Sequence, residues 1–221
     1  MKFNKRKVFA VALAVCLIAT LSLGTLAWFS AEDKVENNFM VADSEDNTGD
    51  KIFSIDVYEY TENSPDEKVP AGDTYKNILP GDKLLKAVHV ANTGHYDQYV
   101  RVIVTISDAT AWINAVGVDF AIEEMFTNYN ATKWTNISKD IEGETDTITY
   151  VLYYTDKLQS GGDITLFTHV NIPESLTQDQ AAAFNQDSVP GFSINVKAQA
   201  VQTRNVGDNA YAAFQTVGMG Y

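Results

Sequence analysis

The stretch that decides the fold lies near the middle of the chain and reads Tyr99-Val100-Arg101-Val102-Ile103-Val104-Thr105-Ile106. It is rich in β-branched residues, which favour extended backbone. Successive side chains of a strand point to opposite faces, so Val100, Val102, Val104 and Ile106 share one face. This stretch therefore predicts a strand with one face lining a hydrophobic core.

Similar patterns recur on both sides of this stretch, separated by turn residues such as Pro80-Gly81-Asp82 and Asn92-Thr93-Gly94. They predict further strands over residues 52–58, 84–91, 120–125, 147–154, 164–172 and 192–201. Helical patterning is confined to residues 177–186 and 209–217, with one more short turn within 107–116. Many strands with few helices predict an all-β fold, an antiparallel jelly-roll-like β-sandwich, because a parallel α/β sheet needs a helix after each strand.

The first 27 residues are typical of an export signal. Four bases lie within residues 2–7, an apolar run covers 8–23, and Gly24-Thr25-Leu26-Ala27 supplies small residues for cleavage between Ala27 and Trp28. We therefore expect a cleaved secretory signal peptide over residues 1–27. An uncleaved membrane anchor is the alternative, since residues 8–29 are long enough to span a bilayer. The cleavage site and the lack of a following positive cluster favour the signal peptide.

Charge and cysteine content narrow the function classes. The whole chain of 221 residues carries a net charge of −13, but residues 1–27 hold four of its 16 Lys and Arg, none of its 29 Asp and Glu, and its one Cys. Cleavage would leave 194 residues with a charge of −17 and no thiol. This composition argues against nucleic acid as a partner and excludes a disulfide scaffold and a cysteine nucleophile. A hydrophobic fraction of 45% is ample for a core.

Residues 28–50 form a distinct N-terminal segment before the main domain at 51–221. Val35, Phe39 and Val41 would share one face of an extended strand, and an acidic run over 43–50 separates them from the rest. One interpretation is a first edge strand of the domain, joined by a solvated loop. The other is a donor strand that pairs with the sheet of a neighbouring molecule.

Several motifs, each weak alone, follow one another in a specific order. They are Gly24-Thr25-Leu26-Ala27-Trp28-Phe29-Ser30, Asn38-Phe39, Leu79-Pro80-Gly81-Asp82-Lys83, Val88-His89-Val90-Ala91-Asn92-Thr93-Gly94, Tyr99-Val100-Arg101-Val102, Leu166-Phe167-Thr168-His169-Val170-Asn171-Ile172-Pro173 and Ile194-Asn195-Val196-Lys197-Ala198-Gln199-Ala200-Val201-Gln202. In this order the chain resembles, over nearly its whole length, the TasA and camelysin family of exported Gram-positive biofilm-matrix and cell-surface proteins, which a SipW-type signal peptidase processes.

The resemblance implies a secreted jelly-roll domain that polymerises into fibres by inserting an N-terminal strand into the next subunit. It favours the donor-strand interpretation of residues 28–41, with Phe29, Val35, Phe39 and Val41 as donor residues. It also implies copies of the same chain as partners, together with other matrix or cell-wall components.

Camelysin-like members of the family are described as metalloendopeptidases, so a zinc site has to be considered. Such a site normally places two His one helical turn apart with a Glu base. His89, His95 and His169 do not have this spacing, although three His from distant positions can still converge in space. The acidic run 43–50 does not fit an EF-hand, which leaves a solvated linker or an irregular calcium site. The sequence also contains no glycine-rich phosphate-binding loop and no motif of a catalytic nucleophile.

The sequence thus predicts a secreted, non-enzymatic structural protein of the biofilm matrix or cell surface, with no catalytic, cofactor or metal residues. Two alternatives stay open: a cell-surface zinc metalloendopeptidase, and a monomeric accessory protein that caps or anchors fibres.

Overall fold

The computed structural model describes residues 30–34, 53–70, 75, 78–107, 109–117, 121–142, 146–175 and 193–219. The predicted signal peptide, most of the N-terminal segment and the predicted helix at 177–186 lie outside these ranges. The described elements are β1 (Ser30–Lys34), β2 (Ile55–Thr61), β3 (Ser64–Val69), β4 (Lys83–Asn92), β5 (Gln98–Ser107), α2 (Thr110–Val116), α3 (Ile122–Met125), β6 (Phe126–Thr127), β7 (Trp134–Glu142), β8 (Thr147–Tyr154), β9 (Asp163–Asn171), β10 (Ser193–Gln202) and α5 (Ala210–Thr216).

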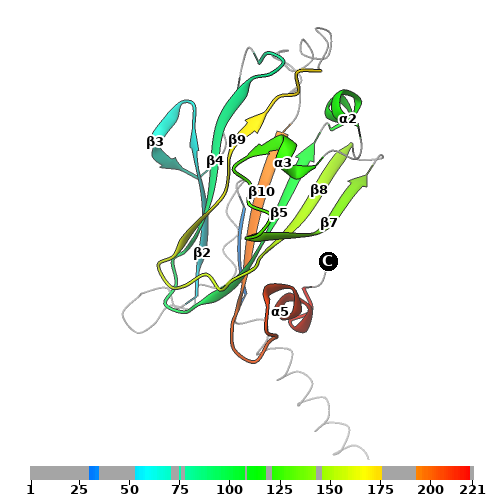
Figure 1. Cartoon of the computed structure of the whole chain (residues 1–221). Helices are drawn as coiled ribbons and strands as arrows, with labels where there is room; N and C mark the ends of the chain where they lie inside the picture. Colours follow the sequence, from blue (N-terminus) through cyan, green and yellow to red (C-terminus); the bar gives the residue numbers. More distant parts are fainter. Residues whose placement is uncertain are drawn as a thin grey trace, which may run out of the picture.

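The strands form two five-stranded antiparallel sheets that pack face to face (Figure 1). Sheet I has the order β1-β10-β5-β8-β7, and sheet II has the order β3-β2-β4-β9-β6. Along the described elements, the chain passes from one sheet to the other after β1, β4, β5, β6, β8 and β9. This interleaving confirms the predicted antiparallel, jelly-roll-like β-sandwich with a few short helices.

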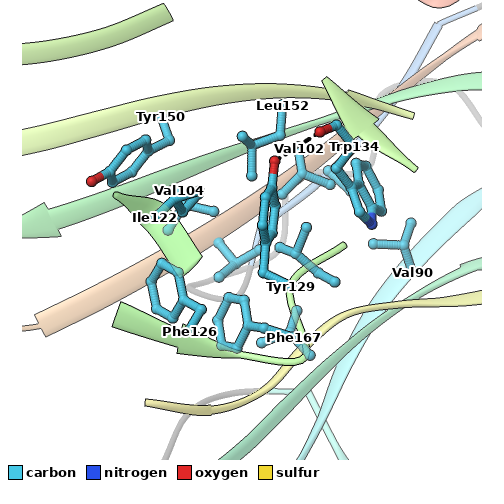
Figure 2. Packing of buried hydrophobic residues seen from close by; sticks show 14 of the residues in the cluster. Val90, Val102, Val104, Ile122, Phe126, Tyr129, Trp134, Tyr150, Leu152 and Phe167 are labelled. Atoms are coloured by element: carbon cyan, nitrogen blue, oxygen red, sulfur yellow. Dashed lines mark hydrogen bonds between the residues drawn. The ribbon is translucent and has the colours of Figure 1, made fainter. Parts of the chain in front are cut away.

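Strand β5 lies at the centre of sheet I and organises the core. It pairs with β10 on one side and with β8 on the other, so that Ile103 lies opposite Lys197 and Val151. The predicted core face is confirmed, because its four residues, Val100, Val102, Val104 and Ile106, are fully buried. Sheet II supplies the facing layer, in which the rings of Phe126 and Phe167 stack with centroids 4.1 Å apart (Figure 2).

The turn at Asn92-Thr93-Gly94 is organised by one buried side chain. The Asn92 amide nitrogen donates to the carbonyls of Tyr96 (2.8 Å) and Leu158 (2.9 Å). Its oxygen accepts from the backbone N–H of Gly94 (3.0 Å) and from Nε2 of Gln98 (2.8 Å). Asn92 therefore uses its donors and acceptor together to join the β4–β5 turn to the chain at Leu158, which explains why a buried polar residue is tolerated there.

A second hydrophobic cluster covers the outer face of sheet I, where α5 packs (Figure 1). The predicted helix at 209–217 is confirmed as α5, and the Asn209 side chain caps it by accepting from the N–H of Ala212 (2.9 Å). Beneath the helix lies Arg101, which is 4% exposed. Its Nε donates to Oε1 of Gln199 (2.6 Å), and Nη1 donates to the carbonyl of Met219. The part of the outer face of sheet I beneath α5 is thus buried as well.

The strand predicted over residues 120–125 is wrong. Ile122–Met125 forms the short helix α3. Ile122 and Met125 are both buried, whereas Glu123 and Glu124 between them are exposed. Apolar residues three apart with two adjacent charges between them match a helical turn, because a strand would bury one of the two charges.

Strands β3, β6 and β7 were not predicted. In β7 the pairing with β8 shifts register between Asn136 and Ser138. This irregularity breaks the period-two pattern by which a strand is recognised. The outer strand β3 contains Pro65 and is mostly exposed, so it carries no apolar alternation, and β6 is only two residues long.

Candidate functional site

Strand β1 lies at one edge of sheet I. It pairs antiparallel with β10, with Ser30 opposite Val201 and Lys34 opposite Lys197. Among the described residues β10 is its only ladder partner, and residues 35–54 separate it from β2, which belongs to the other sheet. An edge strand followed by a long connection can leave its sheet without breaking the ladders between the other strands.

The position of β1 bears on both interpretations of the N-terminal segment, the edge strand and the donor strand. Residues 30–34 form an edge strand of the same chain, and they begin three residues after the predicted cleavage bond between Ala27 and Trp28. The donor residues Phe29, Val35, Phe39 and Val41 lie outside the described residues. Their role therefore stays a prediction.

The pairing between β1 and β10 is a main-chain ladder that covers all of β1, from Ser30 to Lys34. The sequence of β1 is Ser-Ala-Glu-Asp-Lys, and strand addition of this kind gains most of its free energy from backbone hydrogen bonds. The register places Lys34 directly opposite Lys197. Burial lowers the pKa of Lys197, which is consistent with a cost for holding its charge there.

The strand next to β1 in sheet I is β10. If β1 leaves, β10 becomes the edge of sheet I, with Val196, Ala198 and Ala200 lining the core. The alternating pattern predicted a strand here, but no sequence signal identified β1 as its neighbour. By contrast, β3 at an edge of sheet II carries Pro65 and exposed charges, which discourage further pairing.

The three histidines lie in different places. His89 is on β4, with Nδ1 2.9 Å from Oδ1 of Asp163 and its ring stacked on Tyr58 at 5.1 Å between centroids. The hydroxyl of Tyr58 donates to the other oxygen of Asp163, and burial together with this carboxylate raises the pKa of Tyr58. His95 is exposed in the β4–β5 connection, and His169 on β9 has Nδ1 2.9 Å from the Thr168 hydroxyl.

No convergence of these histidines is seen in the described part of the chain. It holds no group of three or more His, Cys, Asp or Glu residues placed to bind a metal ion. Within the same ranges, none of the helices has the length and apolar character needed to cross a membrane.

The fold and this edge define the class of protein: an all-β sandwich whose N-terminal strand closes one edge of a sheet. Comparison with protein-family models, with curated proteins and with solved structures finds no match.

Proposed function

We propose that this protein is a secreted structural subunit of an extracellular matrix or cell surface, which assembles with copies of itself into fibres by donor-strand insertion. The observation that carries the proposal is the position of β1, at a sheet edge, paired with β10 and close to the predicted cleavage bond. The resemblance of its motifs to the TasA and camelysin family supports the same function. In this proposal a SipW-type signal peptidase releases the N-terminus, and other matrix or cell-wall components are further partners.

The register of β1 indicates how a donor strand would lie. If the strand of a neighbouring copy keeps this antiparallel register, Val35 falls opposite Val196 and Asn38 falls opposite Ser193. Because Val196, Ala198 and Ala200 face the core, the residues opposite them share that face. Asp33, opposite Ala198, would lie on this core side, where its charge opposes burial, and the odd-numbered apolar residues Phe29, Val35, Phe39 and Val41 would lie on the same side. Their burial would add hydrophobic free energy to the backbone hydrogen bonds of the inserted strand.

The first prediction concerns the N-terminal segment. The chain that begins at Trp28 is expected to form fibres, whereas a chain that begins at Lys51 is expected to stay monomeric, because it lacks the donor strand. Electron microscopy and analytical ultracentrifugation of the two purified chains would measure this, with circular dichroism to confirm that the shorter chain is folded. Equal assembly by both chains would contradict the proposal.

A matched pair of point variants of the chain that begins at Trp28 tests the same idea without truncation. Phe39→Asp places a charge on the core side of the donor strand and is expected to abolish fibres. Asn38→Asp adds the same charge at the neighbouring position on the opposite side and is expected to leave assembly intact. Similar loss of fibres in both variants would indicate a charge effect rather than strand insertion.

A second prediction concerns electrostatics. Subunits with a charge of −17 repel one another, and raising the ionic strength from about 0.01 M to 0.15 M shortens the screening length from about 30 Å to 8 Å. Fibre formation should therefore accelerate with salt, and also as the pH falls towards the sequence pI of about 4.5. Light scattering would record the lag time. A lag time that is insensitive to both changes would show that charge repulsion does not control assembly.

The proposal also makes the protein non-enzymatic and able to polymerise by itself. Stoichiometric zinc in the purified mature chain, together with chelator-sensitive cleavage of casein, would overturn the first part. A mature chain that binds fibres formed by another protein but forms none alone would overturn the second.

A further inference from the structure

The side of β10 that faces away from β5 is paired with β1 of the same chain. Strand β1 covers Lys197–Val201 in an antiparallel ladder, with one residue of β1 opposite each. On the other side, β5 pairs with the whole of β10, over Ser193–Gln202. Figure 1 shows β1 as the short blue strand beside β10. Over Lys197–Val201, both edges of β10 are therefore used within one molecule.

This cis pairing hides two features that assembly by donor-strand insertion requires. A strand edge presents a single row of backbone N–H and C=O groups, so it pairs with one strand at a time. A donor strand from a neighbouring copy, in the register of β1, would need the positions that β1 already holds. Residues 30–34 also belong to the segment that would be donated. A molecule paired in cis is therefore neither a donor nor an acceptor at this edge.

The energetics favour the cis strand in dilute solution. Exchange of β1 for the same segment of a neighbour replaces the ladder with an identical one, so the backbone hydrogen bonds of residues 30–34 give no net gain. A strand tethered to its own domain meets the edge at an effective concentration of roughly 1 mM. In a solution of about 10 μM protein, a neighbour's strand is about a hundredfold more dilute. Self-pairing therefore competes with assembly, and a higher protein concentration or contacts made outside residues 30–34 overcome it.

We propose that β1 is an autoinhibitory strand: in the monomer it caps the β10 edge of its own domain, and assembly begins only when it is released. The inference rests on the proposed function, because it concerns the regulation of the same edge. The cap also protects the secreted monomer, since a bare strand edge is a template for non-specific pairing. Release of β1 supplies a free donor and a free acceptor at once, so the monomer changes from inert to able to extend at both ends.

A disulfide between β1 and β10 would hold this cap closed. The mature chain, from Trp28 onward, contains no cysteine, so an introduced pair forms the only possible disulfide within it. Two pairs suit the register: Ala31→Cys with Ala200→Cys, and Lys34→Cys with Lys197→Cys. Opposed residues in an antiparallel ladder alternate between a wide and a close kind, and both Cα separations, about 5.5 and about 4.5 Å, lie within disulfide range. Positions 31 and 34 differ by an odd number, so the two variants sample both kinds.

Each oxidised variant is expected to stay monomeric, and the same sample is expected to form fibres once dithiothreitol opens the disulfide. The reduced form is thus the control for the substitutions themselves. A third pair, Asp56→Cys with Ala91→Cys, places the same bond between β2 and β4 in sheet II and should assemble equally well in both redox states. Mass spectrometry of the intact chain would verify each bond, light scattering would record assembly, and electron microscopy would show the fibres.

A mixture of oxidised and unmodified chains tests whether the cap hides the acceptor as well as the donor. The oxidised chain should be inert, so that equimolar addition leaves the rate of assembly and the length of fibres from unmodified chains unchanged. If the oxidised chain instead shortens the fibres, it still accepts a donor strand but cannot pass one on. The acceptor edge would then lie elsewhere, and the inference would be wrong.

Other outcomes separate this inference from the proposed function. Fibres from the oxidised variants with an unchanged lag time, or failure of both pairs to form a disulfide in the monomer, would overturn the autoinhibitory role of β1 and leave self-assembly intact. Absence of fibres from the unmodified mature chain would overturn the proposed function, and the inference with it.

Discussion

Replacing Lys86 by methionine is expected to lower the free energy of unfolding by about 3–5 kcal/mol, because it leaves a buried carboxylate without its partner. The Lys86 ammonium on β4 lies 2.6 Å from both carboxylate oxygens of Glu59 on β2. The Glu59 side chain is fully buried and that of Lys86 is 6% exposed. Urea unfolding followed by circular dichroism would measure the loss.

Two controls identify the cause of this effect. Lys133→Met removes a partner of the exposed pair with Asp156, which has the same 2.6 Å separation, and is expected to change stability little, because water screens exposed charges. The double variant Glu59→Leu with Lys86→Met should recover most of the loss, since replacing both members of a buried pair is often nearly neutral. Equal losses for Lys86→Met and Lys133→Met would show that burial of the pair is not what matters.

Replacing Phe214 by alanine is expected to cost about 3–5 kcal/mol, the range for removing a large aromatic side chain from a core. Phe214 is fully buried between α5 and sheet I. Its ring contacts Tyr153 edge to face, with centroids 5.8 Å apart, and lies 4.4 Å from the guanidinium of Arg101. The variant loses both the packing and the cation–π contact. Urea unfolding would measure the cost, and limited proteolysis would detect release of α5.

The same helix offers the matched control. Tyr211 lies one turn before Phe214, is 43% exposed and touches the same Tyr153 ring at 5.5 Å between centroids. Tyr211→Ala should cost much less, because 43% of the Tyr211 surface remains in water in the folded state, whereas Phe214 is fully buried. Comparable losses for Tyr211→Ala and Phe214→Ala would indicate that helix propensity rather than burial determines the effect.

Together these predictions describe a sandwich held by two separate layers of packing. The inner core joins sheets I and II, and the second cluster fastens α5 to the outer face of sheet I. The proposed assembly edge at β1 lies on the opposite side of β10 from the central strand β5. We therefore expect loss of β1 to leave β5 and β8 paired as before.

Regular alternation made several elements predictable. The strand expected over residues 147–154 coincides with β8, the stretch 99–106 is one residue shorter than β5 at each end, and the strand expected over 192–201 is shifted by one residue from β10. These strands are paired on both sides or bury one full face, so their side-chain pattern is strict. Edge strands such as β3 and irregular strands such as β7 need not alternate apolar and polar residues so strictly. Their sequences therefore show little of the pattern by which a strand is recognised.

The buried hydroxyl of Tyr150, unpartnered among the described residues, was not predictable from the pattern of β8. Tyr150 sits in an alternating run and reads as an ordinary core residue. Its distinctive property is that its hydroxyl meets no acceptor among the described residues, and this depends on neighbours from α3 and β7. The ion pair of Glu59 and Lys86 is similar, since the predicted strand at 52–58 stopped before Glu59 and nothing in the sequence joined the two residues.

The sequence by itself determined the fold class, because the two-residue period of a half-buried strand is a local property that each segment displays alone. The expectation of export and assembly also came from the sequence, because it depends on the order in which the motifs follow one another along the chain. Only the tertiary structure decided which strands are neighbours, that β10 lies beside β1, and which polar groups are buried with or without partners. The physical reason is that backbone hydrogen bonds between strands are the same for any pair of residues. Which strands lie side by side therefore depends on how the side chains of the whole sandwich pack.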